Sequence, residues 1–186
     1  MTVNQHIHEI LEGREVRAQQ IARLNDQNAG TVVSFTVNYP GADKLTPQAE
    51  VIYHAGVKAI ENKINARLCK ETVRFSGYEA LFVTSLSAID TKKAMIALEE
   101  THTLGRLFDI DVFEKNLTKV SRDDLSLPKR KCLLCERPAV ICGRSRRHRV
   151  EELQEEINHR VDSFKEEEDT VQSNSYLLMK GESRWR

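Results

Sequence analysis

The spacing of apolar residues predicts two long helices in the first part of the chain. Apolar residues recur every three or four positions across 3–25, and the polar, glycine-ended stretch 25–30 terminates that pattern. A second apolar stripe occupies 51–68. It follows Thr46 and Pro47, which have the character of an N-cap residue and a first-turn proline.

The remaining elements alternate between short helices and strands. Cys69 is expected to extend the second helix on its core side, and Asp90 is expected to cap a third helix through Leu98. Helices and strands in this order predict an α+β fold, with a mixed or antiparallel sheet covered by helices. The predicted strands, by β-branched or alternating pattern, are 31–37, 71–76, 80–87, 107–113 and 117–120.

Charge is balanced overall but separated locally. The 186 residues hold 28 Lys and Arg against 28 Asp and Glu, at a mean hydropathy of −0.49. Residues 129–149 hold eight Lys and Arg against one acid, a net charge of +7, whereas 151–169 hold two against nine, a net charge of −7. We expect one domain over 1–169, with 150–168 an amphipathic acidic helix, and a loose tail over 170–186.

Composition excludes several classes of protein. Zero net charge argues against a general nucleic-acid binder, and the basic segment 129–149 contains no aromatic residue on which bases would stack. No apolar stretch is long enough for a membrane span, and the N-terminus lacks the pattern of a signal peptide. Three of the four cysteines fall within eleven residues, which indicates a local site in a reducing compartment, so we expect a cytoplasmic protein.

The strand 107–113 carries the first candidate site. Residues two apart in a strand point to the same face, so Asp109 and Asp111 are expected side by side. Two close carboxylates suit Mg²⁺, and Gly105 before the strand would let backbone approach a phosphate. The alternative to a metal site is that the two aspartates are simply part of a solvent-exposed face of the strand. Asp123 or Asp124 would supply a third carboxylate, unless it only caps a turn.

A second candidate site has the pattern C-x2-C-x6-C-x5-H. Four side chains would complete a Cys₃His structural zinc site, and the alternative is a set of buried, reduced thiols among the apolar residues nearby. The cations of the basic segment around these residues could bind a compact polyphosphate, or they could form ion pairs with the acidic helix that follows. We expect the segment to do both to some extent. The residues of the pattern are Cys132, Cys135, Cys142 and His148.

Three motifs carry a resemblance to a known family. They are GRLFDIDV at 105–112, SRDD at 121–124 and RKCLLC at 130–135. In this order and spacing they resemble apo-citrate lyase phosphoribosyl-dephospho-CoA transferase (holo-citrate lyase synthase), with weaker similarity over most of 10–155. The resemblance implies a nucleotidyltransferase-like fold and transfer of a prosthetic group from 2'-(5''-triphosphoribosyl)-3'-dephospho-CoA to a serine of the citrate lyase acyl-carrier (gamma) subunit, with release of pyrophosphate.

The resemblance also implies roles for individual residues. Asp109 and Asp111 would hold Mg²⁺, and Arg106 would stabilise charge on the phosphates. Asp124 would complete the metal shell or accept the serine proton. His102 would help to shape the substrate pocket; the alternative is that it only caps the end of a helix or packs against neighbouring side chains. The residues expected to bind the donor phosphates are Lys129, Arg130 and Lys131.

Alternatives remain at this point. The related transferase that acts on the carrier subunit of malonate decarboxylase would share the metal strand, although the RKCLLC run favours the citrate lyase branch. A zinc-dependent basic binding module would explain 129–149 but would leave the aspartate pair without a role. Because acyl-carrier proteins are generally acidic, the basic segment is also expected to dock the carrier.

Overall fold

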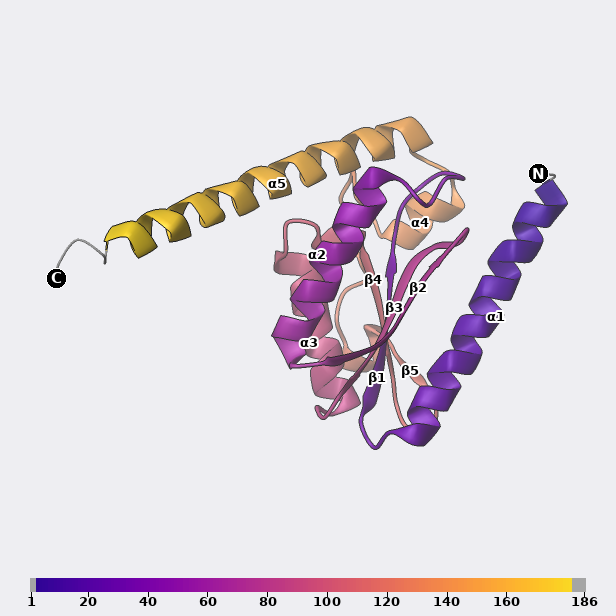
Figure 1. The fold of residues 1–186 in the computed structure, drawn as a ribbon. Coiled ribbons are helices and arrows are strands. Elements are labelled where there is room, and N and C mark those ends of the chain that lie inside the picture. The colour runs from indigo at the N-terminus through magenta and orange to yellow at the C-terminus, as the bar shows by residue number, and fades with distance from the viewer. Residues whose placement is uncertain (1–2, 182–186) are drawn as a thin grey trace.

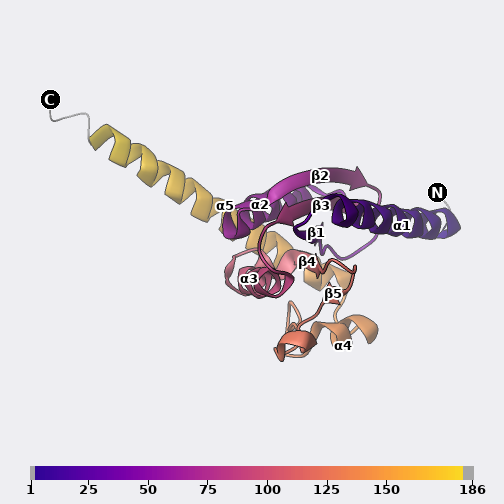
Figure 2. The ribbon, with the colours of Figure 1, turned by 90° about the horizontal axis from the view of Figure 1, so that it is seen from below.

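The computed structural model describes residues 3–181, in which a five-stranded sheet is covered by helices on both faces (Figures 1 and 2). Neighbouring strands are all antiparallel, in the order β2-β3-β1-β4-β5. The predicted α+β class is therefore confirmed. The strands are β1 (Thr31–Val37), β2 (Arg67–Arg74), β3 (Gly77–Thr84), β4 (Phe108–Phe113) and β5 (Lys119–Val120).

The helices divide between the two faces of the sheet. Helices α2 and α3 cover one face and α1 lies along the other; the start of α5 lies at one end of the sheet (Figure 1), and α4 lies beside its β4–β5 edge (Figure 2). Short 3₁₀ turns span Gly105–Leu107 and Asp123–Leu125. The helices are α1 (Val3–Gln27), α2 (Pro47–Ile64), α3 (Ala88–Thr101), α4 (Ala139–Arg144) and α5 (Val150–Gly181).

The main core lies between the sheet and helices α2 and α3. Phe35 of β1 is fully buried there; its ring stacks on Tyr53 of α2 at 6.0 Å and meets the edge of Phe108 at 5.5 Å. Such offset and edge contacts are the preferred aromatic geometries. They fix β4 against α2, and so they set the position of the strand that carries the aspartate pair.

Helix α1 closes only part of the opposite face. Ile21 packs on Val32 and Leu81 near one end of the sheet. Further along, Arg17 pairs with Glu79 at 2.8 Å, where burial raises the pKa of the glutamate and the arginine charge opposes that rise. The face is thus apolar at one end and polar at the other, and the aspartate pair lies toward the polar end, in register with Ser34 and Thr36 of β1.

The second predicted helix ends earlier than its apolar pattern indicated. Asn65 adopts a left-handed conformation, with φ of 45°, and its N–H donates to the carbonyl of Glu61. Asparagine tolerates that conformation and is a common helix terminator. Leu68 and Cys69 therefore lie in strand β2, and Cys69 is half-buried rather than part of the core.

The third helix begins before Asp90, which was expected to cap it. The cap is Ser87, whose Oγ accepts from the N–H of Asp90 at 3.1 Å and donates to its Oδ2 at 2.7 Å. Asp90 is the third residue of the helix, and its carboxylate accepts from the Ser87 hydroxyl rather than from the Ser87 N–H, as it would in a capping box.

Helix α5 is longer than predicted. Its first half buries Ile157 and Val161 in the core beside α2. It then continues to Gly181, through the stretch expected to be a loose tail, and Figure 1 shows it extending away from the sheet and its covering helices. The rest of that expected tail, 182–186, lies outside the described residues. None of the helices in residues 3–181 combines the length and the apolar character that crossing a bilayer requires.

Gly56 of α2 provides a test of this packing. A Cβ at this position would lie 2.3 Å from the ring of Phe35, which is held by its own aromatic neighbours. We expect Gly56→Ala to lower the free energy of unfolding by about 1–2 kcal/mol, because overpacking costs more than the gain in helix propensity. Urea denaturation measures the change.

The matched control is Gly143→Ala in α4. No described atom lies within 4 Å of the Cβ that this substitution adds, so its effect is expected to be neutral or slightly stabilising. Equal stability of the two variants would contradict the close contact between α2 and β1.

Candidate functional site

The aspartate pair lies on the sheet face opposite the main core. Phe108, Ile110 and Val112 are buried on the side of α2 and α3, and the carboxylates alternate with them on the other side. The side chains of Asp109 and Asp111 are 57% and 29% exposed. The predicted arrangement, with both carboxylates on one face, is confirmed.

Strand β5 covers only part of β4 and leaves an open edge. It pairs with Val112 and Phe113, so the preceding residues of β4 have no strand on that side within the described sheet. The carbonyl of Ile110 accepts from Nζ of Lys92 at 2.9 Å, and that of Phe108 accepts from Nη2 of Arg130 at 2.7 Å. Two cationic side chains thus satisfy acceptors that a longer strand would pair.

Lys92 is a site residue that the sequence reasoning missed. It is buried on α3, and burial lowers its pKa while Glu99 and Asp111 oppose that shift. Its signal in the sequence was its spacing: Lys92 and Glu99 share the helical stripe of Met95, where charged residues are unusual unless they are paired.

Arg122 was also missed. Its guanidinium pairs with Glu99 and with Glu100, each at 2.8 Å, and so connects the chain after β5 to the last turns of α3. Arg122 and Glu99 line one wall of the cavity that contains the aspartate pair.

That cavity has a volume of about 570 Å³ and is lined mainly by charged residues. Nζ of Lys119 lies 2.5 Å from Asp111, and Nη1 of Arg130 lies 3.9 Å from Asp109. Each carboxylate therefore meets a cation from a different segment. Further charged residues of the lining are Lys92, Glu99, Arg122, Asp123 and Lys129.

The structure separates the two candidates for a third carboxylate. Asp123 lines the cavity with the aspartate pair. Asp124 instead closes its own turn, because its Oδ2 accepts from Oγ of Ser121 at 2.7 Å and from its N–H at 2.8 Å. These hydrogen bonds lower the pKa of Asp124. The sequence reasoning chose Asp124, whereas the structure places its neighbour at the cavity.

Arg106 is engaged with the main chain of the basic segment. Its Nη2 donates to the carbonyls of Lys131 and Cys132, the latter at 2.7 Å, and Nη2 of Arg130 donates back to the carbonyl of Arg106 at 2.5 Å. Each arginine therefore bonds to the main chain of the other's segment, and together they connect the turn before β4 to 130–132. Burial, followed by the charge of Arg130, lowers the pKa of Arg106.

Gly105 packs against protein and does not face an open phosphate site. It is buried, and an added Cβ would lie 2.5 Å from the carbonyl oxygen of Leu98 and 2.7 Å from that of Glu99. The expected role in approaching a phosphate is thus replaced by close approach to the end of α3.

His102 is not brought to the aspartate pair. Its ring lies 5.0 Å from Phe108 and 5.6 Å from Phe164, on the core side of β4, and its Nδ1 accepts from the N–H of Leu104 at 3.0 Å. Burial lowers its pKa. The packing and capping role, given as the alternative, describes its position.

The basic segment 129–149 remains open to solvent. It meets the acidic helix where Arg149 pairs with Glu151 at 3.3 Å and its N–H donates to Glu152 at 2.8 Å. That contact lies at the start of α5 and involves one cation of the segment. The remaining exposed cations of the segment are Lys129, Lys131, Arg137, Arg144, Arg146 and Arg147.

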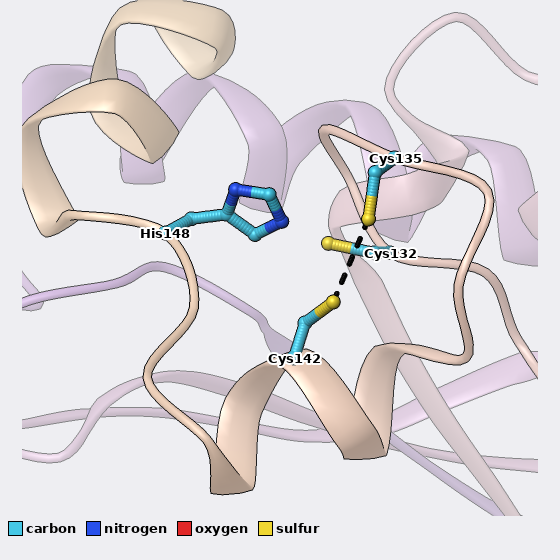
Figure 3. A group of neighbouring side chains, drawn as sticks. All are labelled: Cys132, Cys135, Cys142 and His148. Carbon is cyan, nitrogen blue, oxygen red and sulfur yellow. Dashed lines mark hydrogen bonds between the residues drawn. The ribbon is translucent and has the colours of Figure 1, made fainter.

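The cysteine cluster assembles from three pieces of the basic segment. Cys132 and Cys135 flank a tight turn, Cys142 lies in α4 and His148 precedes α5 (Figure 3). One ligand atom from each residue lies within 4.8 Å of the others. A hydrogen bond from the N–H of Arg137 lowers the pKa of Cys135 to about 6, and burial raises that of Cys142 to about 11.

A second cavity adjoins this cluster. It has a volume of about 590 Å³ and is bounded on one side by Cys132, Cys142 and His148, and on another by apolar side chains of α5. Arg130 lines both this cavity and the one at the aspartate pair. Ala139 also lines both, so the two cavities meet at Arg130 and Ala139. The other cations of the second lining are Arg106, Lys131, Arg146 and Arg149.

Comparison with known proteins gives a consistent result. The family model described as apo-citrate lyase phosphoribosyl-dephospho-CoA transferase matches residues 5–164. A Vibrio cholerae serotype O1 protein named probable apo-citrate lyase phosphoribosyl-dephospho-CoA transferase is 43% identical over 162 residues, covering 82% of this chain and 91% of its own. A Streptococcus pyogenes serotype M18 protein of the same name is 35% identical over 165 residues, covering 85% and 86%. The chain belongs to the apo-citrate lyase phosphoribosyl-dephospho-CoA transferase family.

Proposed function

We propose that this protein transfers the prosthetic group of 2'-(5''-triphosphoribosyl)-3'-dephospho-CoA to a serine of the citrate lyase acyl-carrier (gamma) subunit and releases pyrophosphate. Family membership supports the donor and the acceptor named here. The observation that carries the chemistry is the pair Asp109 and Asp111, which share one face of β4 inside a cavity lined by cations. In this proposal the serine oxygen forms a bond to the α-phosphorus attached to the ribose, and the bond from that phosphorus to pyrophosphate breaks.

The aspartate pair fits Mg²⁺. Both carboxylates are accessible, they alternate on one strand, and hard oxygen donors beside phosphate are the ligands that Mg²⁺ prefers. When bound, Mg²⁺ would neutralise charge on the phosphates of the donor. In the described structure Lys119 and Arg130 neutralise the two carboxylates instead.

The two neighbouring cavities suit a long donor that carries phosphates at separate positions. Arg130 lines both cavities; its Nη2 donates to main-chain carbonyls, but its Nη1 lies 3.9 Å from Asp109 and would bind a phosphate there. Lys129, in the charged cavity, would bind the triphosphate, whereas the second cavity, lined on one side by apolar side chains of α5, would hold part of dephospho-CoA. Arg106 acts mainly by holding 131–132, since its Nη2 is committed to main-chain carbonyls.

Asp123 is better placed than Asp124 to accept the serine proton. It lines the charged cavity, whereas an oxygen of Asp124 is occupied by Ser121 and the lowered pKa of Asp124 makes it a weaker base. The carrier would approach over the exposed arginines of the basic segment, which offer a surface complementary to an acidic protein.

Asp109→Asn and Asp111→Asn test the metal strand. Each should reduce the rate of transfer on the order of 10²-fold or more, because a metal ion contributes several kcal/mol to charge stabilisation. The measurement is the mass gained by the apo-carrier subunit after incubation with enzyme, Mg²⁺ and donor. Asp162→Asn, at an exposed position on α5, is the matched control and should keep normal activity.

Near-normal transfer by both strand variants would contradict the assignment of Asp109 and Asp111 as metal ligands. The identity of the acceptor is tested in the same assay with the malonate decarboxylase carrier subunit in place of the citrate lyase subunit. A preference for the malonate decarboxylase carrier would assign this protein the activity of the related transferase, and the proposed role of Asp109 and Asp111 would stay the same.

Reversal of charge tests the docking surface. A variant carrying Arg137→Glu, Arg144→Glu and Arg147→Glu, which are exposed and line neither cavity, should raise the KM for the carrier several-fold and weaken its dependence on salt, since steering by charge is lost. Steady-state kinetics at two salt concentrations measure both effects.

The control for that variant changes the net charge equally at positions outside the basic segment. It carries Lys63→Glu, Lys70→Glu and Lys93→Glu, all at exposed positions. If both triple variants change the KM alike, net charge alone is responsible and the basic segment is not the docking surface.

A further inference from the structure

We infer that Cys132, Cys135, Cys142 and His148 bind one zinc ion in a closed, structural site. The four side chains converge from a turn, a helix and a loop, and a ligand atom of each lies within 4.8 Å of the others (Figure 3). Tetrahedral zinc with Zn–S bonds of about 2.3 Å places sulfur atoms about 3.8 Å apart. The Sγ atoms of Cys135 and Cys142 are 3.5 Å apart, so a small adjustment is enough to surround an ion.

The histidine gives an independent observation. Figure 3 shows the imidazole of His148 directed toward the three sulfur atoms. Its Nε2 is buried, and no group among the described residues forms a hydrogen bond with it. A buried nitrogen without a partner costs free energy, and a metal ion between it and the thiolates would remove that cost.

Burial in the basic segment argues against a simple core of reduced thiols. Within 126–149, all of which the structure describes, the buried side chains are Cys132 and Cys142. Of the apolar neighbours that such a core needs, Val140 is 46% and Ile141 is 52% exposed, and Leu133 and Leu134 are only half-buried. The centre of this segment is therefore the set of candidate ligands itself.

A disulfide explains less of the arrangement. The Sγ atoms of Cys135 and Cys142 are close enough for a disulfide to form after a small movement. Such a bond would leave the thiol of Cys132 and the imidazole of His148 pointing at the same centre without a role there. Four converging donors match zinc, which takes thiolate and imidazole ligands in tetrahedral geometry. Binding would release the thiol protons, and His148 would coordinate as the neutral imidazole.

The site is distinct from the aspartate pair in chemistry and in role. Sulfur and nitrogen donors favour zinc, whereas the oxygen donors of Asp109 and Asp111 favour Mg²⁺. With four protein ligands, no position is left for water or substrate, so the ion would be structural.

The ion would hold the segment that brings Arg130 to β4. Arg106 donates to the carbonyl of the ligand Cys132 at 2.7 Å, and Arg130, two residues before that ligand, donates to the carbonyls of Arg106 and Phe108. A short helix and a single bridge between Lys131 and Pro138 are the regular structure near the ligands. Zinc would therefore supply the cross-link that fixes Arg130 beside Asp109.

Metal analysis tests the site directly. Wild-type protein, purified under reducing conditions without chelator, should contain about one zinc per chain. Cys69→Ser is the matched control, because Cys69 is the cysteine outside the cluster and lies half-buried in β2. It should also contain one zinc, whereas Cys142→Ser and His148→Gln should lose most of it.

A second experiment does not depend on whether those variants fold. Zinc is removed from wild-type protein with a chelator, and Co²⁺ is added as a spectroscopic probe. A tetrahedral thiolate site produces intense visible and near-ultraviolet bands, which disappear when zinc displaces Co²⁺.

Limited trypsin digestion gives a further readout. Trypsin should cleave the zinc-free protein first at the arginines of 129–149 and cleave it there more slowly once zinc is restored.

Two results would overturn the inference. One is wild-type protein that contains no zinc when purified and shows no thiolate bands with Co²⁺, although its thiols are reduced. The other is a Cys135–Cys142 disulfide in freshly purified, zinc-free protein, found by mass spectrometry, which would assign the cluster to redox chemistry.

Discussion

The open edge of β4 is the feature on which the arrangement of the site depends. Because β5 stops at the end of β4 that holds Val112 and Phe113, the carbonyls of Phe108 and Ile110 need other donors. Arg130 and Lys92 supply them from two different segments, the basic segment and α3. The same edge that lacks a strand therefore gathers cations beside two carboxylates, which is the chemistry that a polyphosphate requires.

Charge in this protein is organised locally. A net charge of zero conceals a basic segment followed at once by an acidic helix, and the structure joins the two mainly where Arg149 meets the start of α5. The arginines of the segment thus differ in their surroundings. Arg130 faces inward and bonds to the main chain, whereas Arg144 and Arg147 face solvent. Donor binding and carrier docking are proposed on different sides of one short segment.

Some elements were predictable from local pattern, and others were not. The strand carrying Asp109 and Asp111 was predicted from strict alternation, because a face buried on one side forces that pattern. The end of α2 was missed, since the apolar spacing continues past Asn65 and only the left-handed conformation of that residue stops the helix. The far half of α5 was also missed, because residues beyond 169 show no clear apolar period.

The sequence by itself determined the α+β class, the aspartate pair on one face, the Cys₃His pattern and the resemblance to the family. Each of these is local, and depends on spacing along one element or on a short motif. The tertiary structure decided which residues share a site. It placed Lys92, Arg122 and Asp123 around the aspartate pair, and assigned Asp124 to its own turn and His102 to a half-buried position beside Phe108 and Phe164. Those positions depend on contacts between segments far apart in the chain, which no local pattern encodes.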